Sequence, residues 1–162
     1  MKLYLVRHAT ASSKLSWDDD DDLRPLTRSG EARFATAAKA LARASALSPE
    51  IIVTSPLVRA AQTAELLSAA VGGSVPIEHD DRLGHDFDLQ RLGEIIAERS
   101  AVSELALVGH NPAFSAVLSA IIGGGSVEVR KGTIALVDIP DVSDPVGRLL
   151  WLAPTSLFAQ AR

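Results

Sequence analysis

The sequence predicts an α/β fold with three layers, in which helices cover both faces of a mainly parallel sheet of about six strands. Short apolar runs of strand length alternate along the chain with longer segments of helical periodicity. These runs are apolar throughout rather than at every second position, which is typical of strands buried on both faces. A chain of 162 residues can bury a sizeable core, and we expect a single domain over residues 1–162.

The composition indicates a soluble globular protein, since 47% of the residues are hydrophobic and 22% are charged. The lack of cysteine excludes a disulfide scaffold, a cysteine nucleophile and thiolate metal sites. No apolar run approaches the ~20 residues that a membrane span needs, and the run at residues 3–6 is too short for a signal peptide. We therefore expect a cytoplasmic protein without a membrane partner.

The net charge is −4, and the five consecutive aspartates at 18–22 account for it, so that the rest of the chain is nearly balanced. This balance, with only 4% aromatic residues, argues against a nucleic-acid partner. Five adjacent carboxylates repel each other, so we expect a solvated, mobile loop at 18–22. We set aside a calcium or magnesium site, because an EF-hand loop needs spaced ligands, a glycine and a distal glutamate.

The first strand is expected over residues 3–6, where the apolar run stops at Arg7 and His8. Small polar residues and the aspartates follow it. Thr27 is expected to cap a helix that continues to about residue 46, because good helix formers dominate that segment and its apolar residues recur at helical spacing. Ser48 and Pro49 end this helix.

A second buried strand over 50–54 leads directly into Ser55 and Pro56, a typical N-cap and first residue of a helix. Asn111 and Pro112 are expected to play the same two parts for a later helix. The remaining expected elements are a helix over 57–71, an edge strand over 75–78, a helix over 89–99 capped by Asp88, a strand over 105–109, a helix over 113–122, and two strands over 133–139 and 149–152 that are close enough in sequence to pair antiparallel.

Cationic or titratable side chains follow three of the predicted strands. Arg7 and His8 follow the first, Arg59 lies in the first turn of the helix after the second, and His110 follows the strand at 105–109. Because parallel strands of one sheet end at the same edge, we expect these four side chains to meet there, beside two helix N-termini. Two guanidiniums and two imidazoles together predict an anion site, most naturally for a phosphoryl group.

The motifs that carry these residues resemble those of the histidine phosphatase superfamily, also called phosphoglycerate mutase-like. They are LVRH at 5–8, TSPLVRAAQTA at 54–64 and VGHNP at 108–112. The short chain, the Arg-His-Ala start and the segment RPLT at 24–27 look most like the small phosphohistidine phosphatase branch. The resemblance covers nearly the whole chain and implies the same three-layer fold.

The resemblance also implies a mechanism. His8 would attack phosphorus and form a phosphohistidine intermediate that water then hydrolyses. Arg7, Arg59 and His110 would hold the nonbridging oxygens, with His110 most effective when protonated and His8 neutral at its attacking nitrogen. A hydrogen bond to a backbone carbonyl would fix the His8 tautomer. We expect no metal and no cofactor, and Arg24 would bind substrate or support a helix entrance.

Many members of this superfamily use a glutamate in the loop after the third strand to protonate the leaving group. This chain has no glutamate in that setting, and Asp80, Asp81, His85 and Asp86 are the candidates there. It is also open that no residue serves as the acid. An alkoxide leaves poorly without an acid, whereas the weak P–N bond of phosphohistidine tolerates its absence.

We therefore expect a metal-independent hydrolase, a phosphatase that acts through a phosphohistidine intermediate. Short stretches between the motifs leave little material for a lid, so a histidine presented on another protein could enter the site. Protein phosphohistidine is the leading substrate. The alternatives are a phosphatase of a small phosphorylated metabolite and a non-catalytic module that binds phosphate or a phosphoprotein.

Overall fold

The computed structural model of the chain describes residues 1–158, which form one six-stranded sheet with the strand order β3-β2-β4-β1-β5-β6. The strands are β1 (Lys2–Arg7), β2 (Ile51–Thr54), β3 (Ile77–His79), β4 (Glu104–Gly109), β5 (Ile134–Asp138) and β6 (Arg148–Ala153). The α-helices are α1 (Arg28–Arg43), α2 (Val58–Ala70), α3 (Leu89–Glu98) and α4 (Ala113–Ile121). No helix within residues 1–158 combines the length and the apolar character needed to cross a bilayer.

The sheet is mainly parallel, as the sequence predicts. Strands β3, β2, β4 and β1 run in the same direction, and β5 is antiparallel to both of its neighbours, β1 and β6. The predicted antiparallel pair of the last two strands is confirmed. The strand that opposes the others is β5, one position inside the edge, because the turn after it reverses the chain again and returns β6 to the direction of β1.

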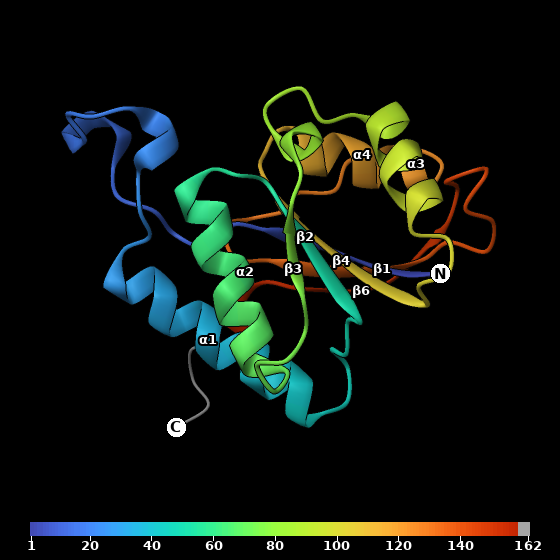
Figure 1. Cartoon of the computed structure of the whole chain (residues 1–162), viewed down its shortest axis with the longest axis horizontal. Helices are drawn as coiled ribbons and strands as arrows, with labels where there is room; N and C mark the ends of the chain where they lie inside the picture. Colours follow the sequence, from blue (N-terminus) through green and yellow to red (C-terminus); the bar gives the residue numbers. More distant parts are fainter. Residues whose placement is uncertain (159–162) are drawn as a thin grey trace.

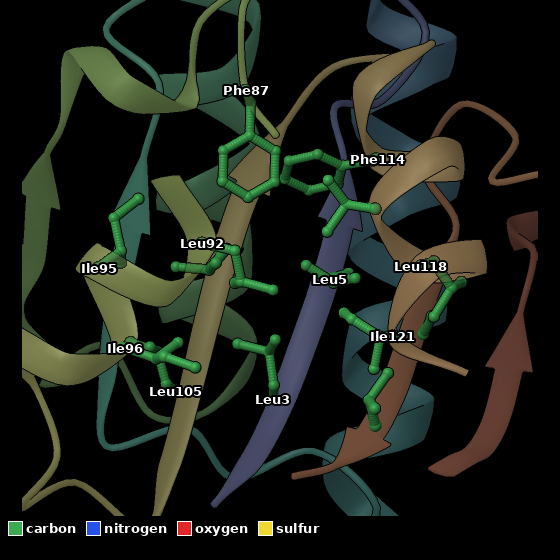
Figure 2. Close-up of a cluster of buried hydrophobic side chains, with 14 of the residues drawn as sticks. Leu3, Leu5, Phe87, Leu92, Ile95, Ile96, Leu105, Phe114, Leu118 and Ile121 are labelled. Carbon is green, nitrogen blue, oxygen red and sulfur yellow. The ribbon is translucent and has the colours of Figure 1, made fainter. Parts of the chain in front are cut away.

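Helices cover both faces of the sheet, with α1 and α2 on one side and α3 and α4 on the other (Figure 1). Strand β1 lies between the two layers of helices. This position explains its continuous apolar run. Leu3 and Leu5 pack in the core under α3 and α4, which Figure 2 shows, whereas Tyr4 and Val6 pack in the core under α1 and α2. Successive strand residues point to opposite faces, so a strand covered on both sides needs apolar side chains at every position.

Two of the predicted helix caps are confirmed by their hydrogen bonds. The Thr27 hydroxyl accepts a hydrogen bond from the Gly30 N–H at 3.0 Å, and the Asp88 carboxylate accepts one from the Arg91 N–H at 2.9 Å. Helix α1 ends at Arg43, earlier than predicted, because the chain turns at Ser45, which has a φ of 54°.

The two predicted pairs of N-cap and proline are wrong in detail. Helix α2 begins at Val58, after an N-cap at Leu57 that has no capping side chain, so Ser55 does not cap it. Helix α4 has Pro112 rather than Asn111 at its N-cap position. The Asn111 Nδ2 donates a hydrogen bond to the Val129 carbonyl at 2.9 Å, while its Oδ1 accepts one from the Ser115 N–H in the first turn of α4 at 3.3 Å. In both places, the polar side chain that precedes the proline accepts a hydrogen bond from a nearby backbone N–H and also bonds to a distant part of the chain.

Candidate active site

The structure brings Arg7, His8, Arg59 and His110 to one end of the sheet. Strands β1 and β4 are adjacent and parallel, and Arg7 is paired in register with Gly109. The next residues along these two strands are His8 and His110, whose ring centroids lie 5.1 Å apart. Arg59 reaches the same place from the first turn of α2. Strand register therefore places two imidazoles side by side, although 102 positions separate them in the chain.

The four side chains line a cavity of about 220 Å³. Arg24 lines it too, as does His85 from the loop after β3. Sequence reasoning missed the other residues around it, which are Lys14, Asp21, Asn111 and Lys131. They come from loops and helix entrances whose positions relative to the sheet no local pattern reveals.

His8 is held as a neutral imidazole with a defined tautomer. Its side chain is buried, and Nδ1 lies 2.7 Å from the Ala9 carbonyl oxygen, which can only accept a hydrogen bond. Nδ1 therefore carries the hydrogen, and Nε2 keeps its lone pair. Burial, followed by the positive charges of Arg59 and Arg7, lowers the His8 pKa to about 4. At neutral pH this ring has a nitrogen available for nucleophilic attack.

The surroundings of His110 also favour its neutral form. Burial and then the neighbouring His8 and Arg59 lower the His110 pKa to about 3. Nε2 lies 2.9 Å from the Ser55 hydroxyl oxygen. This oxygen accepts a hydrogen bond from the Leu57 N–H at 3.4 Å, and the hydroxyl hydrogen is left to donate to Nε2. When Ser55 donates to Nε2, Nδ1 carries a hydrogen that can bind an anion. Ser55 thus positions His110, a role hidden by its resemblance to a helix cap.

These lowered pKa values predict that the protein loses stability in mild acid. An unfolded histidine has a pKa near ~6.5, so between about pH 6.5 and 4 the unfolded chain binds more protons than the folded chain. The free energy of unfolding should therefore fall as pH falls through this window, by up to about 1.4 kcal/mol per pH unit for each histidine. Denaturant unfolding measured from pH 8 to pH 4, a range set by these pKa values, tests this.

His8→Gln and His110→Gln should each flatten this pH dependence, and the matched control His79→Gln, at an exposed position of β3, should keep the wild-type slope. Curves of wild-type slope in both buried-site variants would contradict the assignment. Carboxylates with lowered pKa values, such as Asp21 and Asp80, affect stability only from their ordinary pKa of ~4 downward, so the upper part of this window reports the histidines.

Three buried side-chain nitrogens around the cavity have no hydrogen-bond partner. Within residues 1–158, the buried side-chain N and O atoms without a partner are Arg7 Nε, Arg59 Nε, His110 Nδ1 and Thr133 Oγ1. The first three belong to residues that line the cavity. Buried polar atoms are normally satisfied, and an unsatisfied donor costs about 1–3 kcal/mol. Three such nitrogens at one site are suited to bind the oxygens of a tetrahedral oxyanion.

Asp21 is bound to the site, so the expectation of a wholly solvated loop at residues 18–22 is wrong at this residue. Its Oδ2 accepts a hydrogen bond from Arg59 Nη2 at 3.1 Å, and its backbone carbonyl accepts one from Arg59 Nη1 at 2.6 Å. Arg24 Nε donates to its Oδ1 at 2.9 Å, and this bond, with the charge of Arg59, lowers the Asp21 pKa. Two guanidiniums offset the repulsion from the other aspartates.

Arg24 has both of the roles considered for it. It lines the cavity, and its Nη1 donates to the Ser12 carbonyl at 2.7 Å while Nε holds Asp21. It therefore ties together two parts of the segment between β1 and α1.

Asp21→Asn is expected to tighten the binding of inorganic phosphate, because the Asp21 carboxylate occupies a donor of Arg59 that an anion would use. The Asp21 carboxylate is partly exposed, and an ion pair that solvent screens is worth up to ~1 kcal/mol, so the dissociation constant should fall by about 5-fold. Titration calorimetry measures it. Asp18→Asn removes the same charge from the same run and is the control, because its effect reports long-range charge alone. Equal effects of the two substitutions would contradict direct competition.

The structure separates the four acid candidates in the loop after β3. Asp80 binds Arg82 at 2.7 Å, and hydrogen bonds from Arg82 lower the Asp80 pKa, which favours a carboxylate rather than an acid. Asp86 has 87% of its side chain exposed. Of the four residues, all within the described part of the chain, His85 is the one that lines the cavity.

One group of side chains has the composition of a metal site. Asp21, Asp22 and His85 each place one ligand-type atom within 4.8 Å of the others. Asp22 and His85 are exposed, and Asp21 already binds two arginines. The expectation that no metal takes part in the chemistry stays a prediction.

A family comparison decides between the possible uses of such an anion site. The model of the histidine phosphatase superfamily (branch 1) matches residues 3–91, more than half of the chain. The chain belongs to the histidine phosphatase superfamily. A relative of this histidine phosphatase, an uncharacterized protein of Picosynechococcus sp. strain PCC 7002, is 38% identical over 117 residues. The match covers 69% of the chain and 67% of the relative.

Solved structures resemble this histidine phosphatase over almost its full length. The protein histidine phosphatase SixA complexed with tungstate has a TM-score of 0.85 at 20% identity, covers 97% of the chain and 99% of SixA, and shares the fold. A protein assigned as phosphohistidine phosphatase SixA from Agrobacterium tumefaciens has a TM-score of 0.80 at 25% identity, with 94% and 97% of the two chains covered. Its counterpart from Nakamurella multipartitia has a TM-score of 0.76 at 26% identity, with coverage of 94% and 95%.

Proposed function

We propose that this histidine phosphatase transfers a phosphoryl group to His8 and releases it to water, and that protein phosphohistidine is its main substrate. The observation that carries the proposal is the position of His8. Its free Nε2 is set by the hydrogen bond to Ala9, and it lies among the partnerless nitrogens of Arg7, Arg59 and His110. A nucleophile beside preorganised donors is the arrangement that phosphoryl transfer requires.

The residues divide the chemistry between them. Nε2 of His8 forms the new N–P bond while the bond to the leaving group breaks, and water then hydrolyses the phosphohistidine. Arg7 and Arg59 bind nonbridging oxygens as negative charge develops in the transition state. His110 donates through Nδ1 in its neutral form, and the charge of a bound phosphoryl group favours its imidazolium form, which binds more strongly.

The dimensions of the cavity support a phosphoryl group carried by a larger molecule. Its volume of about 220 Å³ is below the ~300 Å³ at which pockets begin to enclose small ligands. Lys14, His85 and Lys131 at its rim are exposed, so the opening faces solvent. The SixA proteins of Agrobacterium and Nakamurella, at 25% and 26% identity, support phosphohistidine as that group. The chain has no cysteine, which fits a cytoplasmic site of action.

The test compares turnover of a phosphohistidine peptide with a panel of phosphorylated metabolites, in the presence of EDTA. We expect a higher kcat/KM for the peptide and full activity with the chelator. A higher kcat/KM for one metabolite would overturn the assignment of phosphohistidine while leaving a phosphatase. Binding of inorganic phosphate without turnover of any substrate would show a binding module instead.

A further inference from the structure

His85 lines the cavity and is exposed, which places it at the solvent-facing opening. Its ring centroid is 5.9 Å from that of His110, and one of its ring nitrogens is within 4.8 Å of a carboxylate oxygen of Asp21. His85 is exposed, whereas only 6% of His8 is accessible. The site thus has two buried imidazoles, those of His8 and His110, and a third, exposed one.

Two buried residues hold the backbone on either side of His85. Leu83 and Phe87 belong to the apolar core under α3 and α4, and the Phe87 ring packs against Phe114 of α4 with centroids 5.3 Å apart (Figure 2). Phe114 lies so close to Gly109 that a Cβ added to Gly109 would be 2.5 Å from the Phe114 ring. The residue before His110 and the residue after Asp86 therefore contact the same aromatic ring, which fixes His85 relative to the site.

The direction of attack explains why a group at the rim matters. In phosphoryl transfer, the attacking and leaving atoms lie roughly in line on opposite sides of phosphorus. His8 attacks from the buried base, so the leaving group must point toward the opening. His85 is the candidate acid that lines the cavity at that opening. An imidazole can carry a proton near neutral pH and is the side chain most often used for proton transfer.

We propose that His85 is the catalytic residue that protonates the leaving group, which extends the substrates of this site to phosphate esters of aliphatic alcohols. The proposal rests on the proposed phosphatase function. As the N–P bond to His8 forms, the P–O bond breaks, and the leaving oxygen keeps that electron pair and takes the proton of the His85 imidazolium. In the second step, neutral His85 accepts a proton from the attacking water, and the N–P electrons return to His8.

This assignment predicts a dependence on the leaving group. The 4-nitrophenolate ion is stable without a proton, whereas an aliphatic alkoxide is not. His85→Gln is therefore expected to lower kcat/KM for benzyl phosphate by about 10²-fold, the lower range for loss of a general acid. It should leave hydrolysis of 4-nitrophenyl phosphate close to wild type.

His79→Gln is the matched control, because His79 is exposed on β3 and lies outside the cavity lining, and it should change neither rate. Thermal unfolding of each variant verifies the fold. All assays contain EDTA, so that no metal bound by His85 contributes. Equal losses for both esters, or no loss for either, would overturn the role of His85. The proposed function is tested separately by wild-type turnover of 4-nitrophenyl phosphate, and its failure would appear as no turnover at all.

Discussion

His8→Ala is expected to reduce kcat/KM for 4-nitrophenyl phosphate by roughly 10⁴-fold or more, the scale seen when a covalent nucleophile is removed. The buried His8 ring supplies the attacking Nε2, and its Nδ1 is committed to the Ala9 carbonyl. Among the cavity residues, His110 has its ring bound to Ser55 and lacks that orientation. His110 therefore cannot replace His8 as the nucleophile without moving the strand ends.

Two measurements verify this result. Steady-state hydrolysis gives the rate, and intact-protein mass spectrometry after an alkaline quench detects the phosphoenzyme, since phosphohistidine survives in base. The wild type should show the phosphorylated species and His8→Ala should not, while His79→Ala, at an exposed position, should behave as the wild type. A phosphorylated His8→Ala protein would assign the nucleophile to another residue.

Arg59→Gln is expected to reduce kcat by about 10²- to 10³-fold, as does the loss of one preorganised donor to a developing oxyanion. Only 3% of Arg59 is accessible, and its Nε has no partner while both Nη atoms contact Asp21. Arg59→Lys keeps the charge but loses the planar fork of donors, so its kcat should lie between those of the wild type and Arg59→Gln. Single-turnover kinetics separate this effect on chemistry from substrate binding.

The control for charge is Arg28→Gln, at an exposed position in the first turn of α1, which should leave kcat unchanged. Removing Arg59 also leaves the Asp21 carboxylate without its partner, and the double variant with Asp21→Asn separates the two causes. A double variant as slow as Arg59→Gln supports direct binding of the phosphoryl group. Recovery of the wild-type rate in the double variant would mean that Arg59 only neutralises Asp21.

The sequence predicts the fold class and predicts that Arg7, His8, Arg59 and His110 lie together. Both predictions depend on where the buried strands end. A continuous apolar run marks a buried strand, and the side chain after it lies at the carboxyl edge whatever the loops do. Ser55 and Asn111 could not be assigned in the same way. A hydroxyl or amide before a proline predicts a helix cap, but here the side chain also bonds His110 or the Val129 carbonyl, and only the packed fold creates these contacts.

Asp21 is the clearest residue that the sequence could not assign. Repulsion within residues 18–22 predicts solvent exposure for each aspartate alike, and the partner that distinguishes Asp21 is Arg59, 38 positions away. Nothing local marks one carboxylate of five as the residue that reaches α2. The sequence also could not show which of Asp80, Asp81, His85 and Asp86 reaches the cavity. That depends on the path of the loop, which the buried Leu83 and Phe87 determine.

The pairing of β1 with β4 couples catalysis to the stability of the whole molecule. Each of these strands lies between two others in the sheet, and their ladder continues past the strand end through the hydrogen bond from the His8 N–H to the Gly109 carbonyl at 3.0 Å. Separating the two imidazoles requires breaking hydrogen bonds between two central strands, which open less readily than the edges of a fold, so partial unfolding at the periphery leaves the reactive pair intact. Amide hydrogen exchange at His8 should therefore occur only through global unfolding.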